Sequence, residues 1–222
     1  MKIHTFPFGP LASNMYIVEV GGSFVVVDPS VTLARLAGLG RVFDPLALKA
    51  VFITHGHFDH TYRLSEWYSA RPDVPYFMSP DDLFLLNEDL FDNKADDMLL
   101  SDVWNPEKKD DSDSRTVPAA EAEHFFADDS LFEVKVIPTP GHSPGSVCYQ
   151  ITDRTDGETA LFTGDTVFRG AIGRSDLPGG NISELMNSVE KIKKLDGSLR
   201  IFPGHGPDTT ISLEIRSNPY FF

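Results

Sequence analysis

The sequence predicts a mixed α/β fold in a single domain. Short apolar runs of strand length recur along the chain, and glycine or proline ends each of them. Segments of helical length separate several of these runs. The chain has 222 residues, of which 41% are hydrophobic, so it can bury one substantial core. We therefore expect one domain over residues 1–222.

The first half of the chain is expected to begin with a β-hairpin. It spans Asn14 to Asp28, with Gly21 and Gly22 as its turn. In chain order, the elements expected after it are a helix near Thr32 to Leu39, a strand from Ala50 to Thr54, a helix from about Asp59 to Ser69, three strands between Phe132 and Thr163, a helix near Ser183 to Lys194, and a strand from Arg200 to Phe202.

An acidic segment at about 81–129 interrupts this pattern. It carries 16 acidic and 4 basic residues, so it accounts for most of the net charge of -14. We interpret it as a solvated surface insertion that Trp104, Phe125 and Phe126 attach to the domain. A lid or a dimer contact is the functional alternative. The acidic balance disfavours nucleic acid as a partner, because phosphate binding requires a basic surface.

The N-terminal residues MKIHTFPFGP contain neither a signal-peptide core nor a cleavage pattern, and no stretch approaches about 20 apolar residues. These features predict a cytoplasmic protein that does not enter a membrane. Cys148 is the only cysteine, so no internal disulfide can form. It lies in the apolar run Ser146 to Ile151, which favours a buried structural thiol over a nucleophile.

The richest motif is THGHFDH, from Thr54 to His60, directly after the Ala50 to Thr54 strand. Imidazole and carboxylate groups together suit zinc, iron or manganese. His55 and His57 are two residues apart and point to one side in extended backbone, whereas Asp59 and His60 are adjacent. The simplest interpretation is that His55 and His57 bind one metal ion while Asp59 and His60 bind a second.

Three later strands end in the same way. Val134 to Ile137 leads to His142, Ala160 to Thr163 leads to Asp165, and Arg200 to Phe202 leads to His205, each across glycine. Ligand sites in sheet-based α/β folds commonly lie at the carboxyl ends of strands. We therefore expect four strand ends to bring their side chains to one rim.

This ordered set of ligands resembles that of the metallo-β-lactamase superfamily. The stretches TGDTVFRGAIGRSDLPGG, from Thr163 to Gly180, and FPGHGPDTT, from Phe202 to Thr210, resemble the short, single-domain glyoxalase II-type hydrolases. The resemblance extends from about Phe8 to Tyr220. It implies a four-layer αββα sandwich, in which two mixed sheets lie between outer helices.

The resemblance also implies two divalent metal ions, with zinc expected first and iron or manganese as alternatives. Asp165 would bridge them. The first ion would be bound by His55, His57 and His142, and the second by Asp59, His60 and His205.

The implied activity is hydrolysis of a small thioester, with S-lactoylglutathione as the reference substrate. Asp59 and Asp165 would be the catalytic residues, acting on a water activated between the two metals. Arg174 matches a basic position that contacts a carboxylate of glutathione, and a guanidinium suits that role. The alternative is that Arg174 pairs with Asp176 and holds its loop. Only 17 residues follow His205, so we expect substrate contacts from loops of this domain or from another subunit, in a monomer or homodimer.

Other functions remain open at this point. A persulfide dioxygenase of the same fold would bind one iron through His55 or His57, with His142 and Asp165. A lactonase would use all seven ligands, and a non-enzymatic binding role would keep them for stability only. A β-lactamase fits less well, because those enzymes lack an aspartate bridge at the Asp165 position and are normally exported.

Three further residues have side chains that can bind metal. Asp28 begins the turn Asp28-Pro29-Ser30, which favours a helix-capping role; a contact that orients a metal ligand is the alternative. His4 and His124 lie outside the ligand pattern, and we expect both to be structural or solvated.

Overall fold

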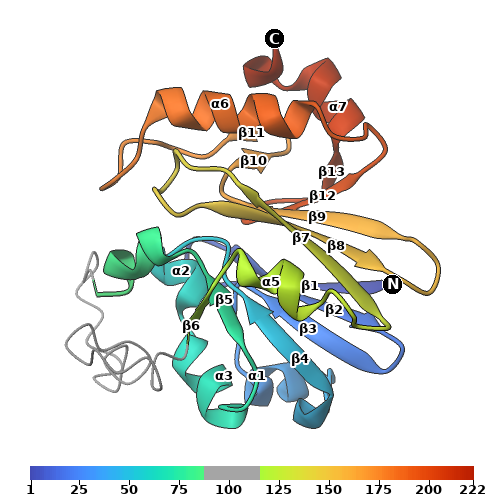
Figure 1. Cartoon of the computed structure of the whole chain (residues 1–222). Helices are drawn as coiled ribbons and strands as arrows, with labels where there is room; N and C mark the ends of the chain where they lie inside the picture. Colours follow the sequence, from blue (N-terminus) through green and yellow to red (C-terminus); the bar gives the residue numbers. More distant parts are fainter. Residues whose placement is uncertain (88–115) are drawn as a thin grey trace.

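The computed structural model describes residues 1–87 and 116–222. Two β-sheets face each other, and helices cover the outer face of each sheet (Figure 1). This arrangement is a four-layer αββα sandwich, so the predicted fold class is confirmed. Trp104 lies outside the described residues.

The first sheet contains six strands in the order β1-β2-β3-β4-β5-β6. The first three strands are antiparallel, and β3 to β6 run parallel. The predicted hairpin is present, and Gly21 and Gly22 at its turn have φ angles of 57° and 84°, which favour glycine. The strands are β1 (Lys2–Phe8), β2 (Ser13–Val20), β3 (Ser23–Val27), β4 (Leu48–Phe52), β5 (Tyr76–Met78) and β6 (Thr116–Pro118).

The second sheet contains five strands in the order β13-β12-β9-β8-β7. Because β7, β8 and β9 alternate in direction and β12 is parallel to β9, the strands β7, β9 and β12 end at the same edge. The strands expected between Phe132 and Thr163 and at Arg200 to Phe202 are all present. They are β7 (Phe132–Pro138), β8 (Val147–Asp153), β9 (Thr159–Gly164), β12 (Arg200–Pro203) and β13 (Thr209–Thr210), with β10 (Val167–Phe168) and β11 (Ala171–Ile172) as a separate pair.

Side chains cap the N-termini of several helices. Thr32 accepts from the backbone N–H of Arg35 at the start of α1, and Asn181 accepts from Ser183 and Glu184 at the start of α6. Both helices lie where the sequence predicted them. The α-helices are α1 (Leu33–Gly38), α2 (Phe58–Thr61), α3 (Leu64–Ala70), α5 (Glu121–Phe125), α6 (Ile182–Lys193) and α7 (Ile211–Ser217), and the 3₁₀ helices are η1 (Pro45–Ala47), η2 (Pro80–Asn87) and η3 (Pro219–Phe221).

The prediction of a single helix from about Asp59 to Ser69 is wrong, because the chain forms two short helices there, α2 and α3. The break occurs at Arg63, whose backbone leaves the helical region and whose N–H donates to Pro29 O at 3.0 Å. The break lets α2 bury His60 in the centre described below, while α3 buries Leu64 and Trp67 against the first sheet.

Three hydrophobic cores hold the layers together. One lies between the sheets, one between the first sheet and the helices α1 and α3, and one between the second sheet and the helices α6 and α7. Phe126 belongs to the inter-sheet core and Phe125 packs on the ring of Phe77, so both attach their segment to the domain as expected.

The two ends of the acidic segment are part of the sandwich. Strand β6 pairs with β5, and Ala119, Ala122 and Phe126 are buried between the sheets. The surface interpretation is therefore wrong for β6, which completes the first sheet, and for the buried residues of 119–126; the side chains of Glu121, Glu123 and His124 are exposed. None of the described helices is long and apolar enough to cross a membrane.

Candidate metal centre

The loops that follow four strands meet at one edge of the sandwich, as predicted. The loop after β4 comes from the first sheet, and the loops after β7, β9 and β12 come from the second. His57 Nδ1 lies 2.9 Å from His142 Nε2, and His60 Nε2 lies 3.3 Å from Asp165 Oδ1. Stacking the two sheets therefore brings together residues that are far apart in the chain.

The convergent side chains form two groups that could each hold a metal ion. One contains His55, His57 and His142, and the other contains Asp59, His60 and His205; within each group the ligand atoms lie within 4.8 Å of one another. A third set, Asp28, His55 and His60, lies equally close together, but it shares a histidine with each of the other two. Asp165 lies between them. Its Oδ2 atom is 3.5 Å from His142 Nε2 and 3.5 Å from His205 Nε2.

Several inward-facing atoms of the centre lack hydrogen-bond partners. His55 Nε2 is buried without one, and Asp59 Oδ2 and Asp165 Oδ1 make no hydrogen bond although each lies 3.3 Å from an imidazole nitrogen. A buried polar atom left unpaired costs about 1–3 kcal/mol. Nitrogen and oxygen donors of this kind are the ligands that zinc and iron prefer, so a divalent metal fits these residues.

Hydrogen bonds on the outer side orient four of the imidazoles. His142 Nδ1 donates to Arg174 O at 2.7 Å, and His205 Nδ1 donates to Leu11 O at 3.0 Å. His60 Nδ1 lies 2.9 Å from Asp28 Oδ2, and His55 Nδ1 lies 3.0 Å from Thr54 Oγ1. Each bond occupies Nδ1 and leaves Nε2 directed toward the centre, as is usual for metal-binding histidines.

Asp28 does not cap a helix, so the capping interpretation is wrong; Thr32 caps α1 instead. Asp28 is 1% exposed and has a φ of 54°. It accepts from Thr54 N and Thr54 Oγ1, both at 2.8 Å, as well as contacting His60. The parallel pairing of β3 with β4 explains this role, because it places the end of β3 beside the start of the THGHFDH loop.

Asp82 is a residue of the site that sequence reasoning missed, since it was counted within the solvated segment. It is fully buried, and its carboxylate accepts from Gly56 N at 2.9 Å, Ser143 Oγ at 2.6 Å and Gly145 N at 2.5 Å. Burial raises the pKa of Asp82, although these hydrogen bonds oppose the shift. The carboxylate thereby joins the His55 loop to the His142 loop.

Glycine is required on both sides of Asp82. A Cβ atom at Gly56 would lie 2.6 Å from Asp82 O, and one at Gly145 would lie 2.7 Å from Asp82 Cγ. Gly56 and Gly145 could have indicated that another segment approaches the backbone closely at these positions, but nothing in the sequence identifies Asp82 as that segment.

The electrostatics of the two groups differ. Burial lowers the pKa of His57 to about 4 and that of His55 well below its usual range, with neighbouring histidines adding to the shift. Burial would also lower the pKa of His205, but the adjacent carboxylates of Asp165 and Asp59 outweigh it and raise the value to about 10. The first group therefore favours neutral imidazoles, whereas the carboxylates of Asp59 and Asp165 favour positive charge beside them.

Arg174 forms a bidentate ion pair with Asp176, with distances of 2.6 Å from Nε to Oδ1 and 2.7 Å from Nη2 to Oδ2. Both side chains are exposed. In this structure the Arg174 side chain therefore pairs with Asp176 and holds its loop, which is the second of the two roles expected for it. Its backbone carbonyl has a separate role, because it fixes the His142 ring.

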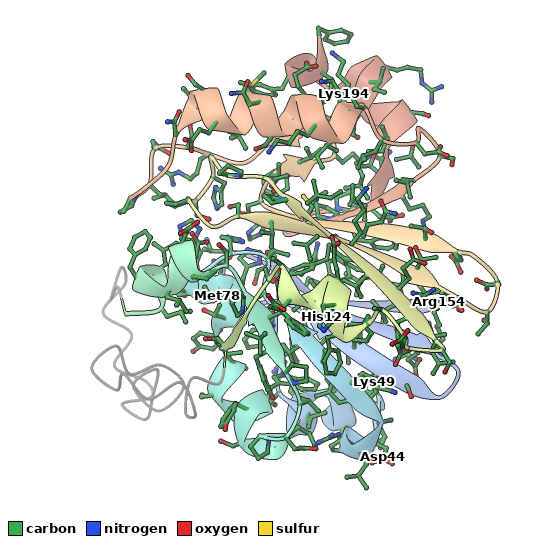
Figure 2. All side chains as sticks on the ribbon, in the orientation of Figure 1. Asp44, Lys49, Met78, His124, Arg154 and Lys194 are labelled. Atoms are coloured by element: carbon green, nitrogen blue, oxygen red, sulfur yellow. The ribbon has the colours of Figure 1, made fainter. Side chains whose placement is uncertain are left out.

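The residues placed outside the centre behave as expected. Cys148 is buried, and burial raises the pKa of its thiol to about 11. His4 pairs with Glu19 on the first sheet. His124 is exposed on α5 (Figure 2).

A cavity of about 370 Å³ opens beside Asp59. It is bordered by the turn between β1 and β2 and by the first residues of α2. The residues that line it are Phe8, Gly9, Pro10, Leu11, Ser13, Phe58, Asp59 and Tyr62.

Two relatives align over nearly the whole chain. An uncharacterised protein of Mycobacterium tuberculosis is 34% identical, over 99% of this chain and 97% of its own. Hydroxyacylglutathione hydrolase GloC of Haemophilus influenzae is 30% identical, over 99% of this chain and 98% of its own.

Solved structures are similar over the same length. TTHA1623 in a di-iron-bound form is 29% identical with a TM-score of 0.66, covering 98% of this chain and 99% of that one. The B3 metallo-beta-lactamase BLEG-1 is 26% identical with a TM-score of 0.71, covering 99% of each chain. The family model of the metallo-beta-lactamase superfamily matches residues 8–205. This chain therefore belongs to the metallo-beta-lactamase superfamily.

Proposed function

We propose that this protein is a metal-dependent hydrolase that cleaves a small thioester at the centre described above. The observation that carries the proposal is the convergence of seven histidine and aspartate side chains from four loops, with buried inward atoms that lack hydrogen bonds. This set contains ligands for two ions. An open cavity beside Asp59 leaves room for a substrate.

The ligand assignment follows the two groups. His55, His57 and His142 would hold one divalent metal and Asp59, His60 and His205 the other, with Asp165 placed between the two groups. Metal ions bound there would supply a hydroxide at neutral pH and polarise the substrate carbonyl. Zinc is the metal we expect, and the di-iron form of TTHA1623 makes iron the alternative to measure.

The protein side chains position the reaction. Asp59 and Asp165 direct carboxylate oxygens into the centre, where one of them can accept a proton from the attacking water. Asp28, Thr54 and the Arg174 carbonyl fix the ligand rings from behind. A thiolate is a good leaving group, so the site needs little general-acid assistance.

The thioester is the finer part of the proposal. It is supported by the 30% identity to hydroxyacylglutathione hydrolase GloC and by the Gly173 to Gly180 loop. The Arg174–Asp176 pair is exposed to solvent, which weakens it, so a carboxylate on the substrate can compete with Asp176 for the guanidinium.

Elemental analysis together with a substrate panel tests the proposal. The panel contains thioesters, a lactone, a β-lactam and a persulfide, the last with oxygen uptake as readout. We expect two metals per chain and the highest kcat/KM on a thioester. One iron with persulfide-dependent oxygen uptake, or turnover of the lactone or the β-lactam alone, would contradict it.

Asp165→Ala tests the centre itself, with Asp208→Ala as a matched control at an exposed carboxylate that pairs with Arg200. We expect Asp165→Ala to lose metal and hydrolysis together while Asp208→Ala keeps both. Thermal unfolding of both variants shows whether the loss is a folding defect. Full hydrolysis by folded Asp165→Ala would overturn the proposal.

A further inference from the structure

We propose that the cavity beside Asp59 binds the acyl group of the substrate, and that this acyl group is uncharged and apolar, with a chain of several carbons. The inference rests on the proposed thioesterase function and specifies its substrate class. We therefore expect a medium-chain aliphatic or aromatic acyl thioester to be a better substrate than a short hydroxyacyl thioester.

The chemistry of the cavity wall selects an uncharged group. Most of the wall is apolar, and the rings of Phe8 and Tyr62 pack together in it with their centroids 6.1 Å apart. Asp59 is the only charged residue among those that line the cavity, and its carboxylate belongs to the candidate metal ligands. No cation is among the lining residues, and the guanidinium groups of Arg35 and Arg63 stack on the rings of Phe8 and Tyr62, 4.9 Å and 4.4 Å from the ring centroids. The wall itself therefore offers mainly apolar surface, which favours an uncharged group.

Three polar atoms of the wall already have hydrogen-bond partners. Ser13 Oγ donates to Asp59 O at 2.7 Å, and Leu11 O accepts from His205 Nδ1 at 3.0 Å. The carbonyl of Gly9 accepts from Ala12 N at 3.2 Å. A hydroxyl on the ligand would find few free partners here, whereas a methylene chain needs none.

Hydrogen bonds connect the cavity wall to the loop that carries His205 in the candidate metal centre. Asn14 Nδ2 donates to Pro203 O at 3.0 Å and to Gly206 O at 2.8 Å, on both sides of His205. Ala12 has a φ of 53°, an unusual value for a residue with a Cβ, and it turns the hairpin so that Leu11 borders the cavity. A group in the cavity therefore lies at a defined position relative to His205 and Asp59.

The two sides of the centre are chemically different. The Arg174 loop contacts His142, a ligand of the first group, whereas the cavity adjoins Asp59 of the second. Small biological thiol carriers are polar, so the guanidinium side suits the carrier and the apolar side suits the acyl group. A thioester whose carbonyl lies at the centre reaches both.

The volume suits more than a lactoyl group. About 370 Å³ lies within the range of pockets that bind small organic molecules. Each methylene that leaves water for such a pocket should raise kcat/KM about fourfold. The gain ends once the cavity is full.

The first test is a homologous series of acetyl, butanoyl and hexanoyl thioesters of N-acetylcysteamine, a neutral thiol, with the metal-loaded enzyme. We expect kcat/KM to rise about tenfold or more from acetyl to butanoyl. Leu11→Asp places a charge in the wall and should abolish this rise. Leu46→Asp, at an exposed leucine in η1, is the matched control and should preserve it.

The second test does not depend on hydrolysis. The S-hexyl thioether of N-acetylcysteamine cannot be cleaved, and its binding is followed by NMR at Phe8, Leu11 and Tyr62. We expect shifts at these residues, and at least tenfold weaker binding in Leu11→Asp than in Leu46→Asp.

Together the tests separate this inference from the proposed function. If the thioether binds in the cavity but no thioester is cleaved, the function is wrong and the apolar subsite stands. If thioesters are cleaved with no dependence on chain length and the thioether shifts none of these signals, the subsite is wrong and the hydrolase stands. An equal chain-length effect in Leu11→Asp and the wild type also overturns the subsite.

Discussion

Replacing Asp28 by asparagine tests how far the residues behind the ligands control the centre. The left-handed φ of 54° is tolerated by asparagine, so the backbone need not change. The amide oxygen can keep the hydrogen bond from Thr54 N, which is 2.8 Å long. The amide nitrogen then replaces the carboxylate oxygen that lies 2.9 Å from His60 Nδ1.

This substitution removes the charge-assisted hydrogen bond directly behind His60. It also removes the acceptor of the Thr54 hydroxyl, which lies 3.0 Å from His55 Nδ1, so His55 is affected only indirectly. A charge-assisted hydrogen bond is worth about 1.5–3 kcal/mol. Loss of a partner behind a metal ligand typically lowers metal affinity about 10–100-fold. We therefore expect one metal to bind Asp28→Asn about 10–100-fold more weakly, while the metal held by His57 and His142 binds nearly as in the wild type.

The assay is a metal titration against a chelating indicator, with metal content measured after dialysis. Asp153→Asn is the control, because Asp153 is equally buried and accepts from Thr155 N at 2.8 Å, without any contact to a ligand. It should lose stability but keep both metals. Two metals bound to Asp28→Asn with wild-type affinity would refute the role that we assign to the contact between Asp28 and His60.

Three further predictions concern stability. Gly145→Ala should lower the free energy of unfolding, measured by urea denaturation, by about 1–3 kcal/mol, because its Cβ would lie 2.7 Å from Asp82 Cγ. Gly38→Ala, which has open space around it in α1, should not lower it. Phe126→Ala should lower the free energy of unfolding by about 3–5 kcal/mol in the same assay, and Phe125→Ala, at a side chain that is 51% exposed, should lower it much less. Equal losses would contradict the burial of Phe126 in the core. Cys148 should resist thiol reagents at pH 8 in the folded protein, since burial raises its pKa to about 11. Because the folded protein holds the thiol proton more tightly than the unfolded chain, Cys148 contributes stability below about pH 9 that is lost as the pH rises to 11. The free energy of unfolding relative to Cys148→Ala should therefore fall by about 1 kcal/mol per pH unit between pH 9 and 11. A difference that does not change with pH would refute this prediction.

The local order of the elements could be predicted from the sequence because it depends on neighbouring residues. The hairpin turn at Gly21 and Gly22 and the capped helices α1 and α6 were found from short patterns of glycine, capping residues and apolar spacing. The convergence of His55, His142, Asp165 and His205 was also predictable, since each follows a strand and strand ends gather at one edge.

Contacts between distant segments could not be predicted in this way. Asp82 lies in a stretch whose composition indicates solvent exposure, yet it is buried between the loops of Gly56 and Gly145. Asp28 has the local pattern of a cap, yet pairing of β3 with β4 carries it to His60.

The sequence by itself therefore determined the ligand types, their order and the fold class, because chain-local patterns and side-chain chemistry contain that information. Only the tertiary structure decided which carboxylates orient the ligands and where an apolar cavity opens beside Asp59. The physical reason is that burial and hydrogen bonding depend on what the packed sheets bring within a few ångströms, and residues far apart in the chain supply those contacts.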